Sequence, residues 1–150
     1  MNVKRFFATL FITLAMIGSA FGATPEQAKA MVDKALAHVK AVGAEKAYVD
    51  FNTPGNQFFD GELYIFAYDM QGKNLALGGN PKMTGKSLID MKSADGKPLI
   101  KDMIEIIKTK GSGWYDYKWA NPETKKIQDK TSYITKIPGT EAFLGCGIYK

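Results

Sequence analysis

Residues 63–68, with the sequence LYIFAY, form a strand-like segment without a polar face, and this segment constrains the fold more than any other. Successive side chains of a strand point to opposite faces of its sheet. One face is therefore aliphatic, with Leu63, Ile65 and Ala67, and the other is aromatic, with Tyr64, Phe66 and Tyr68. Because both faces are apolar, both must be covered. We expect an interior strand, with a helix on its aliphatic face and a different layer on its aromatic face.

A long helix is predicted to precede this strand. The residues TPEQ place Thr24 at the N-cap, Pro25 at the first helical position and Gln27 at the third, which is a capping box. Apolar residues then recur at helical spacing, namely Ala28, Met31, Val32, Ala35, Val39 and Val42. Gly43 is the predicted end, and the helical pattern can resume through Ala47 and Tyr48.

The remaining segments combine strand and helix patterns. A β-hairpin is predicted over residues 61–81, with its turn around Gln71 and Gly72. A second amphipathic helix over 99–107 ends at Gly111, and three antiparallel strands follow at 113–119, 127–137 and 141–149. Because the helices are not interleaved with single strands, this order predicts an α+β fold rather than a parallel α/β sheet.

The first residues have the pattern of a secretory signal peptide. Lys4 and Arg5 precede an apolar run at 6–17, and small residues follow up to Gly22. The run is shorter than the about 20 apolar residues of a spanning helix, which argues against a retained anchor. We expect a signal peptide at residues 1–22, a single domain at 23–150, a periplasmic or otherwise extracytoplasmic location, and no membrane-integral segment after cleavage.

Charge and rare residue types exclude several function classes. Arg5 is the only arginine, and the formal net charge is only +5, so nucleic-acid binding is not expected. His38 and Cys146 are the only residues of their types, which allows neither a His-based triad nor a two-histidine metal site. We interpret His38 as a boundary residue and Cys146 as a core residue. The segment GGNPKMTGKS has one residue too many for a phosphate loop. No enzyme activity, metal or cofactor is expected.

What remains is a group of aromatic residues accompanied by a lysine. In the strand GWYDYKW, Tyr115, Tyr117 and Trp119 share one face, and the next strand brings Lys130 and Tyr133. Apolar walls with a few polar tips are typical of a small-molecule pocket. Hydroxyl, indole and ammonium groups all donate hydrogen bonds, so the guest would be an acceptor or a small anion. The alternative is that these aromatic residues only fill a core.

Several segments, in this order, resemble the single Cache domain, a PAS-like extracytoplasmic sensor of sCache type 2. They are FNTPGNQFFDGELYIFAYDMQG, NPKMTGKSL, DGKPLIKDMIEIIKTKGSGWYDYKWANP, KTSYITKI and GCGIY, and the resemblance covers about residues 26–150. It implies a long N-terminal helix packed on a central five-stranded antiparallel sheet, with a ligand pocket on the other sheet face. The resemblance implies a small-metabolite ligand, because members usually bind small metabolites, often short carboxylates such as acetate, propionate, pyruvate or lactate.

The resemblance also implies site residues. The family's Y-x-W-x-x-P segment supplies pocket walls, its K-x-x-Y segment polar anchors, and its first strand an aromatic floor. The matching residues of this chain are Tyr117 and Trp119, Lys130 and Tyr133, and Tyr64 and Phe66, respectively. Strict alternation puts Lys130 and Tyr133 on opposite faces unless their strand bulges. Relatives often carry His-Pro where this chain has Asn80-Pro81, so no histidine contact is carried over.

The sequence thus predicts an exported, stand-alone sensor module that binds a small organic acid with two to four carbon atoms, for signal transduction or solute sensing. No catalytic residue is assigned. Direct transmembrane signalling is in doubt, because no exit helix or signalling domain is recognised in the sequence. The alternative is an accessory protein with a vestigial pocket that docks on a membrane-bound receptor, kinase or transporter.

Overall fold

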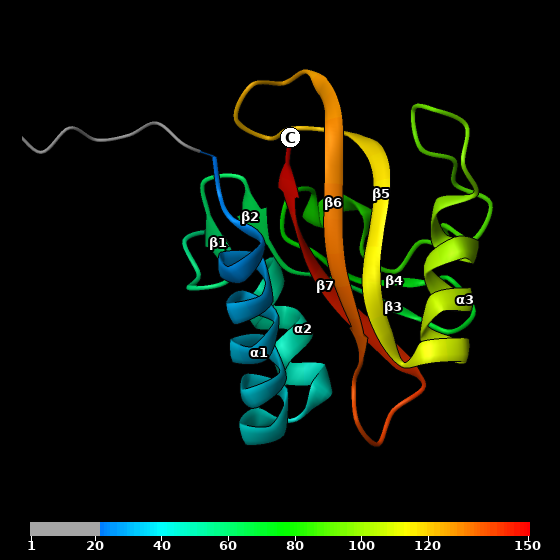
Figure 1. Ribbon diagram of the computed structural model, residues 1–150. Coiled ribbons are helices and arrows are strands. Elements are labelled where there is room, and N and C mark those ends of the chain that lie inside the picture. Colours follow the sequence, from blue (N-terminus) through cyan, green and yellow to red (C-terminus); the bar gives the residue numbers. More distant parts are fainter. Residues whose placement is uncertain (1–21) are drawn as a thin grey trace, which may run out of the picture.

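The computed structural model describes residues 22–150, which form a five-stranded antiparallel sheet between two helical layers. Helices α1 (Pro25–Val42) and α2 (Ala44–Asn52) cover one face, and α3 (Leu99–Lys110) covers the other. Figure 1 shows α1 and α2 together on one side and α3 on the opposite side. This arrangement confirms the α+β fold. The predicted signal peptide lies, up to residue 21, outside the described residues.

The sheet has the strand order β4-β3-β7-β6-β5, so that β7 is central. Its strands are β3 (Phe66–Asp69), β4 (Asn74–Leu77), β5 (Ser112–Ala120), β6 (Ile127–Lys136) and β7 (Ala142–Tyr149). The last three strands form the predicted antiparallel meander, in which β6 pairs with both neighbours in a continuous register. The β3–β4 hairpin joins the meander through pairing of β3 with β7. A short 3-10 helix, η1 (Pro81–Met83), follows β4.

The predicted strand at 63–68 is divided between two sheets. Its first part, β2 (Leu63–Tyr64), pairs with β1 (Phe59–Asp60) in a separate two-stranded sheet. Ile65 makes the connection: its amide donates to the Phe58 carbonyl at 3.2 Å, and its carbonyl accepts from the Gly78 amide at 3.0 Å. Both faces of the segment are buried, as predicted. β2 therefore lies beside the five-stranded sheet and not within it.

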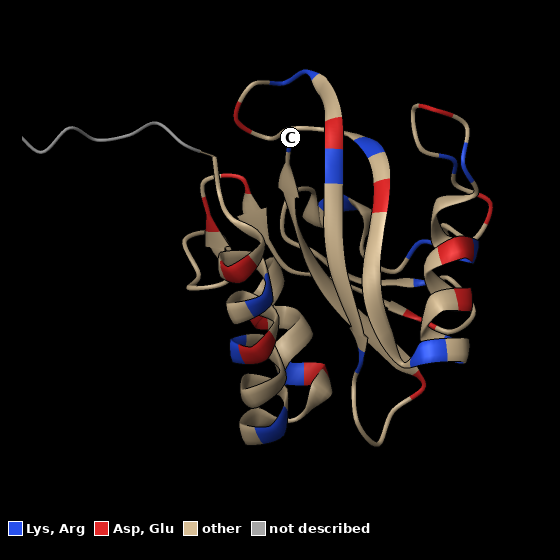
Figure 2. Cartoon of the chain, viewed as in Figure 1, with Lys and Arg blue, Asp and Glu red and all other residues tan. Residues whose placement is uncertain are grey.

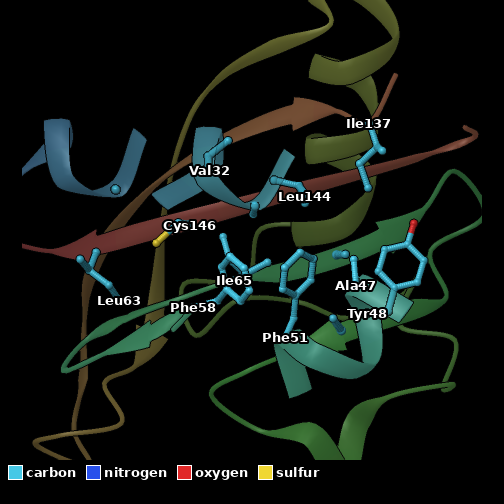
Figure 3. Close-up of a cluster of buried hydrophobic side chains, with 14 of the residues drawn as sticks. Val32, Ala47, Tyr48, Phe51, Phe58, Leu63, Ile65, Ile137, Leu144 and Cys146 are labelled. Atoms are coloured by element: carbon cyan, nitrogen blue, oxygen red, sulfur yellow. The ribbon is translucent and has the colours of Figure 1, made fainter. Parts of the chain in front are cut away.

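The aliphatic face of residues 63–68 lies against α1 and α2. Figure 3 shows Leu63 near Cys146, and Ile65 near Phe58 and Phe51, in this cluster. The capping box of α1 is present, because the Gln27 amide donates to Thr24 Oγ1 at 3.3 Å and the Thr24 amide donates to Gln27 Oε1 at 2.8 Å. The chain is thus held at the start of the helix that covers this face.

The break between α1 and α2 falls at Gly43, which has a φ of 86°. A residue with a side chain rarely adopts this backbone conformation, so the glycine allows the chain to turn between two helices. The resumption of the helical pattern after Gly43 is confirmed as α2, whose Ala47, Tyr48 and Phe51 are buried.

The aromatic face of residues 63–68 lies against α3. The predicted stripe of this helix is buried, with Leu99, Ile100, Met103, Ile104 and Ile107. The helix ends at Gly111, which has a left-handed φ of 75°. The sequence did not identify the layer that covers the aromatic face, and the structure shows that it is α3. Most of the predicted site residues lie between α3 and the sheet.

Two glycines of β7 make room for side chains on the α3 face. A Cβ at Gly145 would lie 2.6 Å from Phe66 Cζ, and a Cβ at Gly147 would lie 2.5 Å from Lys130 Cε. Both distances are shorter than real Cβ contacts. The glycine spacing of the central strand therefore decides where a phenyl ring and a lysine side chain can lie.

The substitution Gly145→Ala is expected to lower the free energy of unfolding by about 1–3 kcal/mol, as overpacking does in well-filled cores. The added Cβ would meet the backbone carbonyl oxygen of Tyr133 at 2.7 Å as well as the Phe66 ring. The matched control is Gly113→Ala in β5, where the Cβ would meet only Cγ2 of Ile106, at 3.0 Å. Urea denaturation checks this prediction, and a Gly145→Ala variant as stable as the wild type would contradict it.

Candidate functional site

A buried lysine lies on the α3 face of the sheet. Lys130 is in β6, and alternation along this regularly paired strand directs Lys130, Ser132 and Ile134 to one face. Only 1% of the Lys130 surface is exposed. Lysine is almost never fully buried unless it is paired. The side chain passes over Gly147, so the fold itself makes the space for this ammonium group.

The Lys130 ammonium is surrounded by tyrosines. Nζ donates a hydrogen bond to the Tyr64 hydroxyl at 2.8 Å. It also lies 4.1 Å from the centroid of the Tyr64 ring and 4.8 Å from that of Tyr149. Both distances are in the range of a cation–π interaction. Tyr149 is held in turn by a hydrogen bond from its hydroxyl to the Ala120 carbonyl, at 2.8 Å.

No carboxylate is paired with Lys130 in the part of the chain that the structure describes. The ion pairs found there join other residues, such as Lys118 with Asp129 at 2.7 Å. Figure 2 shows that acidic and basic positions occur together along both α1 and α3. Burial is the main cause that lowers the pKa of Lys130, and the nearby Tyr117 partly opposes this shift. The groups that replace the lost hydration of Lys130 Nζ, the side chains of Tyr64 and Tyr149, are thus neutral.

Two tyrosine hydroxyls next to the ammonium remain protonated at neutral pH. Burial raises the pKa of Tyr64 to about 12, although the neighbouring Tyr149 and Trp119 side chains counteract the rise. Burial also raises the pKa of Tyr117 to about 12, against the opposing charge of Lys130. The Tyr117 hydroxyl lies 3.0 Å from Ser132 Oγ. The site is therefore rich in neutral hydrogen-bond donors around one ammonium group.

Two adjacent hollows lie along these side chains. The inner hollow, between α3 and the sheet, has a volume of about 10 Å³ and is lined by Tyr64, Phe66, Tyr68, Leu77, Leu99, Ile100, Met103, Tyr117 and Trp119. This is about the space that one water molecule needs. The outer groove has a volume of about 290 Å³ and includes Asn80, Asn121 and Lys125 in its wall. Tyr64, Leu77 and Trp119 line both spaces, so they form the partition between them.

The structure brings five of the six predicted site residues together. Four of them line the inner hollow, and Lys130 contacts one of these four through its hydrogen bond to Tyr64. Tyr133 lies elsewhere: it packs with the α1 cluster, its ring is 5.4 Å from that of Trp114, and Lys29 Nζ lies 5.5 Å from its centroid. The reason is the regular pairing of β6, which contains no bulge that would bring residues 130 and 133 to the same face.

Sequence reasoning missed Tyr149 and the aliphatic wall. Tyr149 pairs with Lys130 across β7 and β6, and alternation along β7 puts it on the same face as Gly145 and Gly147. That alternation was a usable signal. Leu77, Ile100 and Met103 also line the inner hollow, but a helix stripe looks the same whether it faces a solid core or a cavity.

The other candidate residues have structural positions. His38 is half-buried between α1 and α2, with Nε2 2.8 Å from Asp50 Oδ2, which confirms a boundary residue. Cys146 is fully buried, and burial raises the pKa of its thiol to about 12, which confirms a core residue. Within residues 22–150, no three His, Cys, Asp or Glu side chains are grouped as a metal would require. The helices of this region also lack the length and apolarity for crossing a membrane.

Comparison with known proteins gives a consistent picture. A family model described as a Cache domain matches residues 18–150. The sensor histidine kinase MctS of Rhizobium johnstonii is 31% identical over 86 residues, which are 57% of this chain and 18% of the kinase. The chain spans less than a fifth of the length of the curated relatives that it matches.

Solved structures share the fold at lower sequence identity. A methyl-accepting chemotaxis protein from Vibrio parahaemolyticus superimposes with a TM-score of 0.71 at 24% identity, covering 83% of this chain and 86% of that one. A structure described as the basis for carboxylic acid recognition by a Cache chemosensory domain gives a TM-score of 0.69 at 23% identity, covering 83% and 91% of the two chains.

The substitution Lys130→Met is expected to stabilise the folded protein at neutral pH, by about 1–4 kcal/mol, because replacing buried charges by apolar groups of similar size often does so. This advantage should decrease as the pH rises. Lys130 has a lower pKa in the folded chain than the ordinary value of 10.5. Between these two pKa values the unfolded chain binds a proton that the folded chain has released, so the stability of the wild type increases with pH.

Urea denaturation of both proteins, from about pH 7 to about pH 8.5, measures this difference below the range where the tyrosines ionise. The matched control is Lys136→Met on the same strand. Lys136 is exposed and paired with Glu141 at 3.5 Å, so its replacement should change the stability by less than about 1 kcal/mol at every pH. A Lys130→Met variant less stable than the wild type at neutral pH would contradict the account of the buried charge.

Proposed function

The chain belongs to the Cache domain family, and from this premise we propose that it binds a short carboxylate with two to four carbon atoms at Lys130. Relatives support a sensory role, because one is a sensor histidine kinase and another is a methyl-accepting chemotaxis protein. The structural neighbour described by its recognition of carboxylic acids supports the ligand class. The geometry around Lys130 supports the position of the carboxylate.

The observation that carries this proposal is the buried ammonium group. An ammonium group offers three donors, and within residues 22–150 Lys130 makes one hydrogen bond, to a neutral hydroxyl. A carboxylate beside Nζ would compensate the charge that burial penalises, and the hydrogen bonds would be charge-assisted. Tyr117, whose hydroxyl is protonated and close to this charge, would donate to the same carboxylate. A neutral ligand would leave the ammonium group uncompensated.

The walls of the inner hollow determine the rest of the ligand. Phe66, Leu77, Ile100 and Met103 are apolar and line the space next to Tyr117. They would contact a short alkyl chain, whereas a second charge on the ligand would have no partner among them. We therefore assign the anchor role to Lys130, polar contacts to Tyr117 and Trp119, and apolar contacts to these walls. This selects monocarboxylates over dicarboxylates.

The biological setting follows from the same premise. We propose that the protein samples organic acids outside the cytoplasm and that its ligand-bound form is recognised by a membrane-bound receptor, kinase or transporter. The sequence pattern of residues 1–22 supports export, and the sensory relatives support a membrane partner.

Thermal unfolding in the presence of sodium acetate, propionate, pyruvate or lactate tests the proposed binding. At least one of these salts should raise the melting temperature of the wild type, with a stabilisation of about 2.7 kcal/mol at a hundredfold excess over Kd. Sodium chloride at the same concentration should give no comparable rise. Lys130→Met should lose the response to the acid, because the anchor is removed, whereas Lys136→Met should keep it.

Two results would reject the proposal. One is a wild-type protein whose melting temperature none of the four acids raises above the sodium chloride control. The other is a Lys130→Met variant that responds to the acid as strongly as the wild type. The variant is expected to be stable without ligand, so a lost response would not reflect unfolding.

A further inference from the structure

The inner hollow is too small for the ligand in the arrangement that the structure shows. Its volume of about 10 Å³ suits one water molecule, and every acid in the proposed class is larger than water. The outer groove, at about 290 Å³, has enough space. A ligand that reaches Lys130 must therefore move at least one of the side chains that separate the two spaces, which are Tyr64, Leu77 and Trp119.

Tyr64 is the partition residue that also competes for the anchor. Its hydroxyl oxygen lies 2.8 Å from Lys130 Nζ, at a hydrogen-bonding position that a carboxylate oxygen would use. Tyr149 and Trp119 also lie close enough to this hydroxyl to lower its pKa. Leu77 has no polar atom in its side chain, so it cannot form a hydrogen bond with Lys130 in place of a carboxylate. The Tyr64 oxygen thus lies where an anion would be favoured.

The Tyr64 ring is only 2% exposed, but two of its neighbours are a glycine and an exposed phenylalanine. It belongs to β2, a two-residue strand whose partner strand β1 is exposed at both positions. The next layer over the ring is Gly79, where a Cβ would lie 2.8 Å from Tyr64 Cζ, so this side carries no side chain. The ring also stacks on Phe59, which is 38% exposed, with centroids 6.0 Å apart. On the far side of the partition, the outer groove could accommodate the displaced ring.

We propose that Tyr64 is a displaceable internal ligand of Lys130. Its hydroxyl binds the ammonium group until a carboxylate replaces it. When the Tyr64 ring moves aside, the partition opens and the inner hollow and the outer groove become one continuous space. This inference rests on the proposed function and adds an element of regulation to the same site. Tyr64 is then a positioning residue. Its hydrogen bond to Lys130 stabilises the ligand-free protein and is broken in the ligand-bound protein. The hydroxyl therefore weakens carboxylate binding while it stabilises the protein without ligand.

The substitution Tyr64→Phe separates this role from that of a direct ligand contact. Removal of the hydroxyl should tighten the binding of the acid about three- to tenfold, the effect of one net hydrogen bond. The same variant should have a lower melting temperature than the wild type without acid, because Lys130 loses its hydrogen-bond partner. A residue with only a structural role would not change affinity and stability in opposite directions, and a direct ligand contact would weaken binding when removed.

Isothermal titration with sodium acetate, propionate, pyruvate and lactate, together with thermal unfolding, measures both effects. The matched control is Tyr133→Phe, because Tyr133 lies on the α1 face. The affinity of this variant for the acid should stay within about twofold of the wild-type affinity. Weaker or unchanged binding by Tyr64→Phe, with a wild type that binds, would overturn the displacement and leave the proposed function intact. A wild type that binds none of the four acids would overturn both.

Discussion

The burial of one ammonium group is the interaction on which the site depends. Lys130 gives up its hydration on the α3 face of the sheet and receives the Tyr64 hydroxyl and two aromatic rings in return. Neutral groups offset only part of the desolvation of a charge. In the proposed function, an anion that binds beside Lys130 compensates this buried charge. Part of the free energy that burial costs the protein then contributes to the affinity for the ligand.

The fold provides this balance through the central strand. Gly145 and Gly147 of β7 lack the side chains that would otherwise fill the α3 face, and their places are taken by Phe66 and Lys130. Tyr149, on the same face, packs on the ammonium group from the end of the strand. A single alternating pattern in β7 thus creates both the space for the lysine and part of its aromatic surroundings.

Much of this architecture could be predicted from the sequence, because local patterns determine it. The apolar two-sided segment at 63–68, the capping box at Thr24 and the stripe of α3 each correspond to an observed element. The division of that segment into β2 and β3 could not be predicted, because it depends on the long-range pairing of Ile65 with Phe58 and Gly78. For the same reason, the sequence did not show that Tyr64 lies outside the main sheet.

The parts of the site that depend on regular strand pairing could be predicted from the sequence. The parts that depend on how distant side chains pack together could not. Alternation along β6 already separated Lys130 from Tyr133, and the structure places Tyr133 on the α1 face. In contrast, the hydrogen bond between Lys130 and Tyr64 joins residues 66 positions apart in the chain. The volume of the hollow is likewise a property of how α3 packs on the sheet, and no local pattern contains it.

A crystal structure of the wild-type protein, grown with the acid that binds most tightly, tests the central claim most directly. The account predicts a carboxylate oxygen within about 2.7–2.9 Å of Lys130 Nζ, the distance of a charge-assisted hydrogen bond, with the Tyr64 hydroxyl moved away from Nζ. An acid bound elsewhere, with the hydrogen bond between Lys130 and Tyr64 unchanged, would contradict it.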